Sequence, residues 1–201
     1  MNANQCLKML REMKDVAFAT VDSNGNPRVR IIDIMYADEE KVVFCTARGK
    51  NFYEELREKP MIGITGMNAS YEMVRLHGPV HKMENQKEWI DLIFEENPSM
   101  KAVYPGEARY VLEAFCVKEG ELEYFNLGVE PIQRYFFSLG EDTSIQEGYE
   151  IGDTCIECGT CATVCPQSCI EEGTPYKIIQ EHCLHCGLCY EQCPAKAIYK
   201  R

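Results

Sequence analysis

Residues 155–166 read CIECGTCATVCP, and residues 183–194 read CLHCGLCYEQCP. Both stretches follow the pattern C-x2-C-x2-C-x3-C-P, and the second begins 28 residues after the first. Three thiolates at this close spacing let one loop surround three corners of a cubane, while the fourth cysteine starts a short helix and points away. The repeated pattern therefore predicts a small domain that holds two iron–sulfur clusters.

In this arrangement the fourth cysteine of each run is a ligand of the other run's cluster. One [4Fe–4S] cluster is expected on Cys155, Cys158, Cys161 and Cys193. The other is expected on Cys183, Cys186, Cys189 and Cys165. This part of the chain, roughly residues 149–201, resembles a bacterial two-cluster ferredoxin, and the resemblance implies a small α+β domain.

Other uses of these cysteines fit the pattern less well. A zinc site needs four ligands, usually as two separated C-x2-C pairs. A disulfide framework needs an oxidising compartment, and residues 1–18 do not read as a signal peptide. No stretch approaches the about 18 uninterrupted apolar residues of a membrane span. We therefore expect a cytoplasmic protein that does not enter the membrane.

Length and charge limit what the remainder of the chain can do. The 201 residues leave room for one further domain of about 140 residues with its own core. The net charge of −11 argues against a nucleic-acid partner, because such binding needs clustered Lys and Arg. The expected plan is a first domain at 1–137, a polar linker at 138–150 and the cluster domain at 151–201.

The first domain is expected to be mainly β with a few short helices. Hydrophobic periodicity predicts helices at 3–14, 50–58 and 84–96. Runs of β-forming residues predict strands at 16–22, 28–38, 41–47, 61–67, 71–83, 108–119 and 121–128. Mostly antiparallel neighbours in this order suggest a closed or partly split β-barrel.

A strand-to-helix turn at residues 45–51 is the candidate anion site of this domain. The chain has neither a G-x-G-x-x-G stretch after a strand nor a G-x-x-x-x-G-K-[ST] loop. At the turn, Thr46, Arg48 and Lys50 stand just before a predicted helix. A helix N-terminus with two cations suits a dianionic phosphate, although such residues also occur as a solvated helix cap.

The order of elements around this turn resembles the FMN-binding split barrel of the pyridoxamine-phosphate-oxidase-like superfamily. The resemblance rests on PRVRIIDIMY, VVFCTA and RGKNFYEELREKP, and it covers roughly residues 5–130. It implies that the strand after the first turn lies along the flavin ring, with contacts from Arg28, Val29, Arg30 and Ile31. Among these, Arg30 is expected to provide the side-chain contact. It also implies a phosphate site at Thr46, Ala47, Arg48, Lys50 and Asn51.

The resemblance further implies a homodimer with the flavin at the subunit interface. The chain departs from the oxidases of this superfamily in two respects. Its turn is shorter than their Ser-Arg-Lys version, and no counterpart of their pyridoxal-phosphate-binding residues is found. The vitamin substrate of those enzymes is therefore not predicted here.

Together these patterns predict an FMN-dependent iron–sulfur oxidoreductase. Electrons would pass from two [4Fe–4S] clusters to FMN and on to a small organic acceptor, with an external donor or acceptor at the clusters. One alternative is an electron carrier or redox sensor that serves a protein partner and binds no small substrate. Another is a split barrel that holds haem or deazaflavin in place of FMN.

The remaining cysteines and two histidines have structural interpretations. Three cysteines among apolar neighbours are expected to be buried: Cys6, Cys45 and Cys116. Cys169 takes the repeat position that Ala197 fills in the second run, which indicates packing rather than a ninth ligand. His182 and His185 flank cluster cysteines and are expected at the surface.

Overall fold

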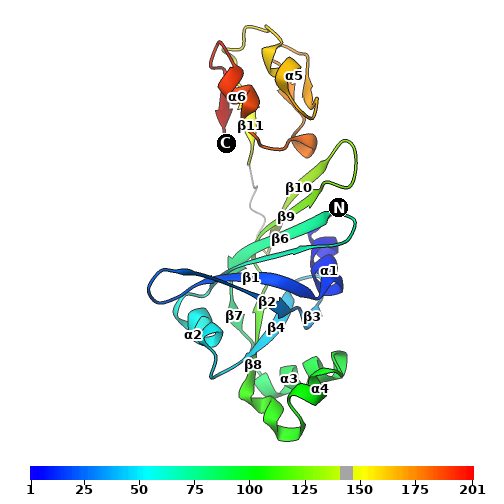
Figure 1. Ribbon diagram of the computed structural model, residues 1–201, viewed down its shortest axis with the longest axis vertical. Coiled ribbons are helices and arrows are strands. Elements are labelled where there is room, and N and C mark those ends of the chain that lie inside the picture. The colour runs from blue at the N-terminus through cyan, green and yellow to red at the C-terminus, as the bar shows by residue number, and fades with distance from the viewer. Residues whose placement is uncertain (141–146) are drawn as a thin grey trace.

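The computed structural model describes residues 1–140 and 147–201 (Figure 1). Residues 1–140 form a mainly β part, which we call the barrel domain. Residues 147–201 form a small α+β part, which we call the cluster module. The predicted fold class is confirmed in both parts. No helix among the described residues is long and apolar enough to cross a membrane.

A six-stranded antiparallel sheet forms one side of the barrel domain, in the order β10-β9-β6-β5-β1-β2. Its strands are β1 (Asp15–Val21), β2 (Pro27–Asp33), β5 (Met61–Met67), β6 (Glu72–Pro79), β9 (Gly120–Asn126) and β10 (Gln133–Leu139). Side chains alternate between faces, so Val16, Phe18 and Thr20 of β1 are buried inward. β2 and β10 are the two edges of this sheet.

A four-stranded sheet completes the barrel, in the order β3-β4-β8-β7. Its strands are β3 (Tyr36–Ala37), β4 (Val42–Ala47), β7 (His81–Lys82) and β8 (Leu112–Val117). Phe18 of the first sheet packs edge-on against Phe44 of the second, with ring centroids 4.9 Å apart. The core of the barrel therefore lies between the two sheets.

Two runs predicted as single strands each divide between the sheets. Residues 28–38 become β2 and β3, separated by the buried pair Ile34 and Met35. Residues 71–83 become β6 and β7, separated by the buried Val80. The prediction of continuous strands is wrong here, because the buried residues at these breaks lie where the chain turns from one sheet to the other.

Helices cover the barrel domain on different sides (Figure 1). Helix α1 (Ala3–Met13) is capped by Asn2, whose Oδ1 accepts from the Gln5 N–H at 2.9 Å, and it buries Cys6 and Leu7. Helix α2 (Asn51–Glu58) packs on the barrel core. Helix α3 (Gln86–Glu96) covers the other face of the four-stranded sheet, followed by α4 (Met100–Val103) and the 3-10 helix η1 (Gly106–Val111).

The structure differs from the sequence prediction near the end of the barrel domain. Residues 108–111 lie in η1 rather than in a strand. The strand β10 was not predicted, and it extends the sheet beyond residue 128. The predicted linker at 138–150 contributes its first residues to β10 and its last residues to the strand β11 (Tyr149–Ile151). Its central residues 141–146 lie outside the described residues.

The cluster module repeats one backbone pattern twice. Its strands pair as β11 with β14 (Ile198–Lys200) and β12 (Ile170–Glu171) with β13 (Lys177–Ile178). Its helices are α5 (Thr160–Val164), η2 (Gln180–His182) and α6 (Leu188–Gln192). Gly159 and Gly187 precede α5 and α6 with φ of 73° and 80°, a left-handed conformation that favours glycine. The sequence duplication is therefore also a duplication of structure.

Candidate functional site

Two cavities of the cluster module are each lined by four of the predicted ligands. The first cysteine set lines one cavity and consists of Cys155, Cys158, Cys161 and Cys193. The second cysteine set lines the other and consists of Cys165, Cys183, Cys186 and Cys189. In each cavity the fourth cysteine comes from the other run. The fold therefore brings the thiols together in the crossed grouping that the spacing predicts.

The surroundings of these thiols suit sulfur ligands of a cluster. The backbone N–H of His185 donates to Cys183 Sγ at 3.4 Å, and that of Ala197 donates to Cys193 Sγ at 3.3 Å. Such hydrogen bonds tune clusters held by thiolates. Within the described residues, no three or more His, Cys, Asp or Glu side chains are arranged around a single metal ion. The cysteines surround cavities instead.

Cys169 is a fifth cysteine at the second cavity. Its side chain is buried, and its Sγ lies 3.5 Å from Cys165 Sγ. Ala197, its counterpart in the repeat, is buried as well. Burial at both positions agrees with a packing role for Cys169. The other three cysteines of the chain, Cys6, Cys45 and Cys116, are buried in the barrel domain as predicted.

The predicted phosphate site lies at the junction of β4 and α2. Thr46 is buried and its Oγ1 has no hydrogen-bond partner within the described structure. Lys50 is the N-cap residue of α2 and is exposed, and its side chain makes no hydrogen bond or ion pair with a described residue. Asn51 beside it is also exposed, and Ala47 is half-buried. This junction therefore has the unpartnered hydroxyl of Thr46, the unpaired ammonium of Lys50 and the N-terminus of α2.

The guanidinium of Arg48 is held by neighbours on η1 and β8. Its Nη1 donates to the Tyr110 carbonyl oxygen at 2.8 Å and lies 3.8 Å from Glu113 Oε1. Burial alone would raise the pKa of Glu113, but hydrogen bonds from Lys82 and Tyr53 hold that pKa below its usual value. Arg48 is thus held by a carboxylate that stays ionised, so this predicted phosphate ligand already has a partner.

The predicted ring-binding strand, β2, presents different residues on its two faces. Val29 and Ile31 lie on the outer face and are 69% and 63% exposed. They pair with Ala19 and Ala17 of β1, so small side chains adjoin them. Among the described strands, β2 has a hydrogen-bonded neighbour on one side only. The strand therefore offers a flat apolar surface with an open backbone edge.

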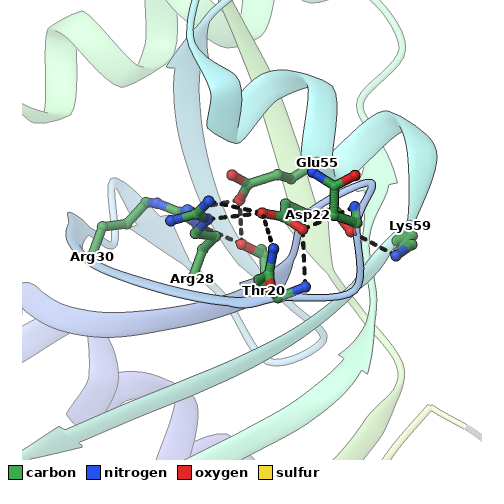
Figure 2. Close-up of polar contacts among 8 residues, drawn as sticks. Thr20, Asp22, Arg28, Arg30, Glu55 and Lys59 are labelled. Carbon is green, nitrogen blue, oxygen red and sulfur yellow. Dashed lines mark hydrogen bonds and ion pairs between the residues drawn. The ribbon is translucent and has the colours of Figure 1, made fainter.

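Arg28 and Arg30 lie on the opposite face of β2 (Figure 2). Arg28 Nη2 lies 2.9 Å from Asp22 Oδ2. Hydrogen bonds to the Asp22 carboxylate lower its pKa to about 2. The largest contribution comes from the Asn26 backbone N–H, and smaller ones come from the side chains of Asn26 and Arg28. This ion pair fixes the turn between β1 and β2.

Arg30 belongs to a more buried network under α2 (Figure 2). Its Nη2 lies 2.7 Å from Glu55 Oε2, its Nη1 donates to Thr20 Oγ1 at 2.6 Å, and the Thr20 hydroxyl donates to Glu55. The guanidinium carbon lies 4.5 Å from the centre of the Phe52 ring. The side chain that the sequence assigned to the flavin therefore has a structural position here.

The barrel domain contacts the cluster module through Ile132 and β10, and the module contributes η2 and the second cysteine run. Arg134 Nη1 donates to the Cys183 carbonyl oxygen at 3.2 Å, and His182 Nδ1 lies 2.8 Å from the Ile132 carbonyl oxygen. The rings of Phe136 and His185 stack with centroids 5.9 Å apart. The expectation that both histidines lie at the surface is wrong, since both are half-buried. The apolar, aromatic run QRYFFSL was the signal that was missed.

The comparisons with known proteins divide the chain as its fold does. A family model described as pyridoxamine 5′-phosphate oxidase matches residues 4–119, and one described as a 4Fe-4S dicluster domain matches residues 148–199. No protein with a curated description matches the chain.

Solved structures resemble the barrel domain. A NimC/NimA family protein from Clostridium acetobutylicum is 25% identical with a TM-score of 0.57, covering 67% of this chain and 90% of its own. A relative of general stress protein 26 from the same species is 15% identical with a TM-score of 0.54, covering 67% and 95%. A heme binding protein from Mycobacterium smegmatis is 12% identical with a TM-score of 0.53, covering 69% and 58%. The last two show the fold alone.

Proposed function

Because the chain belongs to the pyridoxamine 5′-phosphate oxidase family through residues 4–119 and carries a 4Fe–4S dicluster domain at 148–199, we propose that it is an iron–sulfur flavoprotein oxidoreductase. In this proposal, electrons pass from two [4Fe–4S] clusters to FMN and then to a small organic acceptor. The observation that carries it is the direct contact of the second cysteine run with the barrel domain, through Arg134 and Cys183.

Eight thiolates would hold the two clusters. The first and second cysteine sets each supply four, and backbone N–H groups donate to the sulfurs of Cys183 and Cys193. When bound, such clusters transfer single electrons. Cys158 and Cys186 are exposed, so each set has one thiol at the surface of the module.

The junction of β4 and α2 would hold the FMN phosphate. Lys50, Asn51 and the unpartnered Thr46 hydroxyl supply the polar groups, and the exposed Val29 and Ile31 supply an apolar surface for the ring. When bound, FMN exchanges electrons singly or in pairs. Arg28 and Arg30 hold the turn and α2 in place beside this strand rather than reaching its outer face.

The outer face of β2 also supports a homodimer. Val29 and Ile31 are large apolar side chains left exposed on an edge strand, and such surfaces are commonly covered in an assembly. Ile31→Asp should shift the protein to monomers in sedimentation equilibrium. Lys8→Asp, on the exposed side of α1, should leave the mass unchanged. A wild-type protein that sediments as a monomer would contradict the dimer.

Composition of the anaerobically purified protein tests the cofactors. We expect close to eight iron and eight sulfide per chain, from the two complete cysteine sets, and one FMN. A visible spectrum distinguishes FMN from deazaflavin and from haem, the alternatives for this barrel. Four iron per chain after full reconstitution would contradict the two-cluster proposal.

An electron carrier or redox sensor is the second candidate function. Ile156, between two cysteines of the first set, is 64% exposed, and an apolar side chain at this position would suit a docking protein. Steady-state assays with nitro compounds and quinones separate the two functions. Turnover supports the oxidoreductase, while reduced flavin that is stable with every small acceptor supports the carrier.

A further inference from the structure

Three charged residues form a chain between the barrel domain and the cluster module. Arg75 Nη1 lies 2.5 Å from Glu123 Oε2, and Arg134 Nε lies 3.0 Å from Glu123 Oε1. Two cations around one carboxylate leave these three residues with a net charge of +1, and the further carboxylate that acts on Arg134, that of Glu147, is exposed. Arg134 is the member closest to the module, and its side chain is 9% exposed.

Contacts with both parts of the chain hold the Arg134 guanidinium in one orientation. Its guanidinium carbon lies 4.2 Å from the centre of the Phe125 ring, and its Nη1 donates to the Cys183 carbonyl oxygen. A guanidinium remains protonated in proteins, so this charge is permanent. The second cysteine set thus has a buried cation in contact with one of its members.

The first cysteine set lacks such a neighbour in the described structure. Among the described residues, the hydrogen bonds and the ring contact that join module to barrel come from the second run and from His182 just before it. Lys196 follows Cys193 closely in the chain, but it is exposed. Water and salt screen an exposed charge strongly and a buried charge weakly. Two sites with equal ligands therefore have unequal electrostatic surroundings.

We propose that Arg134 is a positioning residue that docks the second cysteine set on β10 and raises the reduction potential of the cluster held there above that of the other cluster. The inference rests on the proposed function, since it requires both clusters. Net charge and hydrogen bonding around a cluster set its potential, and a fixed positive charge favours the reduced, more negative form. Arg134 thereby makes the reduction potentials of the two clusters unequal, with the higher potential at the second cysteine set.

This inequality directs electrons toward the barrel domain. With both clusters bound, an external one-electron reductant would lose one electron to the site of the first set, and the higher potential at the second set would favour its transfer there. Each transfer moves one electron and breaks no bond. The contacts of Arg134, His182 and Phe136 hold the receiving site against the barrel.

A redox titration followed by electron paramagnetic resonance tests the proposal on the anaerobic holoprotein. Arg134→Gln should lower the higher of the two cluster potentials by about 59 mV or more, a tenfold change for a one-electron couple. The lower potential should stay where it is. The matched control is Lys196→Gln, which removes an exposed cation near the first set and should move neither potential by a comparable amount.

Two further variants keep the test decisive if Arg134→Gln loses iron. Glu123→Gln removes the carboxylate that offsets Arg134 and should raise the same potential, which is the opposite sign. Arg134→Lys keeps the charge and should retain most of the difference between the clusters. Unchanged potentials in both Arg134→Gln and Glu123→Gln, or a shift of the lower couple instead, would overturn the inference. A wild-type chain without two clusters would instead overturn the proposed function.

Discussion

Arg28 and Arg30 of β2 each form an ion pair, and the two pairs should contribute unequally to the free energy of unfolding. Arg30→Ala leaves the Glu55 carboxylate buried without its cation. We expect a loss of unfolding free energy near the low end of about 3–5 kcal/mol, the range for breaking a buried pair. Urea unfolding followed by the fluorescence of Trp89, the single tryptophan, measures this in the barrel domain.

Arg28→Ala is the matched control for this loss. Its partner Asp22 lies in an exposed turn, so the pair is screened by solvent. We expect an unfolding midpoint that is hard to distinguish from wild type. Equal losses in the two variants would contradict the larger structural role assigned to Arg30.

Lys50 is the cation with a free ammonium at the predicted phosphate site. Lys50→Ala should weaken FMN binding by about 1–3 kcal/mol, the scale of a charge-assisted hydrogen bond. Arg48→Ala is expected in the same range only if Arg48 leaves Glu113 to reach the phosphate. Fluorescence titration of the flavin-free protein measures both, with Lys8→Ala as the control. Unchanged affinity in the Lys50/Arg48 double variant would place the phosphate elsewhere.

The cysteine pattern predicted its site from the sequence more completely than the basic residues of the barrel domain did. The cysteine runs predict both cavities, because three thiols of each set are near neighbours in one run and the repeat supplies the fourth from the other run. The cations of the barrel are less predictable, because their partners come from distant parts of the chain. Arg30 meets Glu55 of α2, and Arg48 meets Glu113 of β8. A list of basic residues cannot show which of them remain free.

At the scale of elements, the two runs of the cluster module exchange their fourth cysteines. Cys193→Ser should therefore damage the cluster of the first set, whose other ligands belong to the distant run. Electron paramagnetic resonance of the reduced protein should show loss of one cluster signal, the same one that Cys158→Ser removes. Loss of the signal that Cys186→Ser removes would refute the crossed ligation.

Cys169→Ala is the control for that exchange. Cys169 lines the second cavity beside Cys165, but the second set without it already supplies the four thiols that a [4Fe–4S] cluster needs. The variant should keep both signals and its full iron content. Loss of iron on this exchange would mean that Cys169 is a ligand and that the predicted packing role is wrong.

Elements with strong local signals were predictable, and elements defined by distant contacts were not. Helix α1 and the strands β1, β4 and β5 lie close to their predicted bounds. The strand β10 depends on pairing with β9 and on contacts with η2 in the other part of the chain. The breaks at Ile34 and Val80 depend on which sheet each half joins, which periodicity alone cannot show.

At the scale of the whole molecule, the cluster module and β2 lie at opposite edges of one sheet. The module contacts β10, and β2 is the last strand on the other side. Five strand spacings of about 4.8 Å separate these edges by roughly 24 Å along the sheet. In the proposed homodimer, a flavin at the subunit interface would also be open to the partner's module. Assembly would then be part of the electron path.

In the proposed function, clusters and flavin exchange electrons within one assembly. This exchange can be followed by rapid anaerobic mixing with a one-electron reductant, recorded at cluster and flavin wavelengths. We expect bleaching of the clusters and then reduction of the flavin, at a rate that does not change with protein concentration. A flavin phase whose rate rises with protein concentration would rule out this exchange and would show that the clusters serve a separate partner.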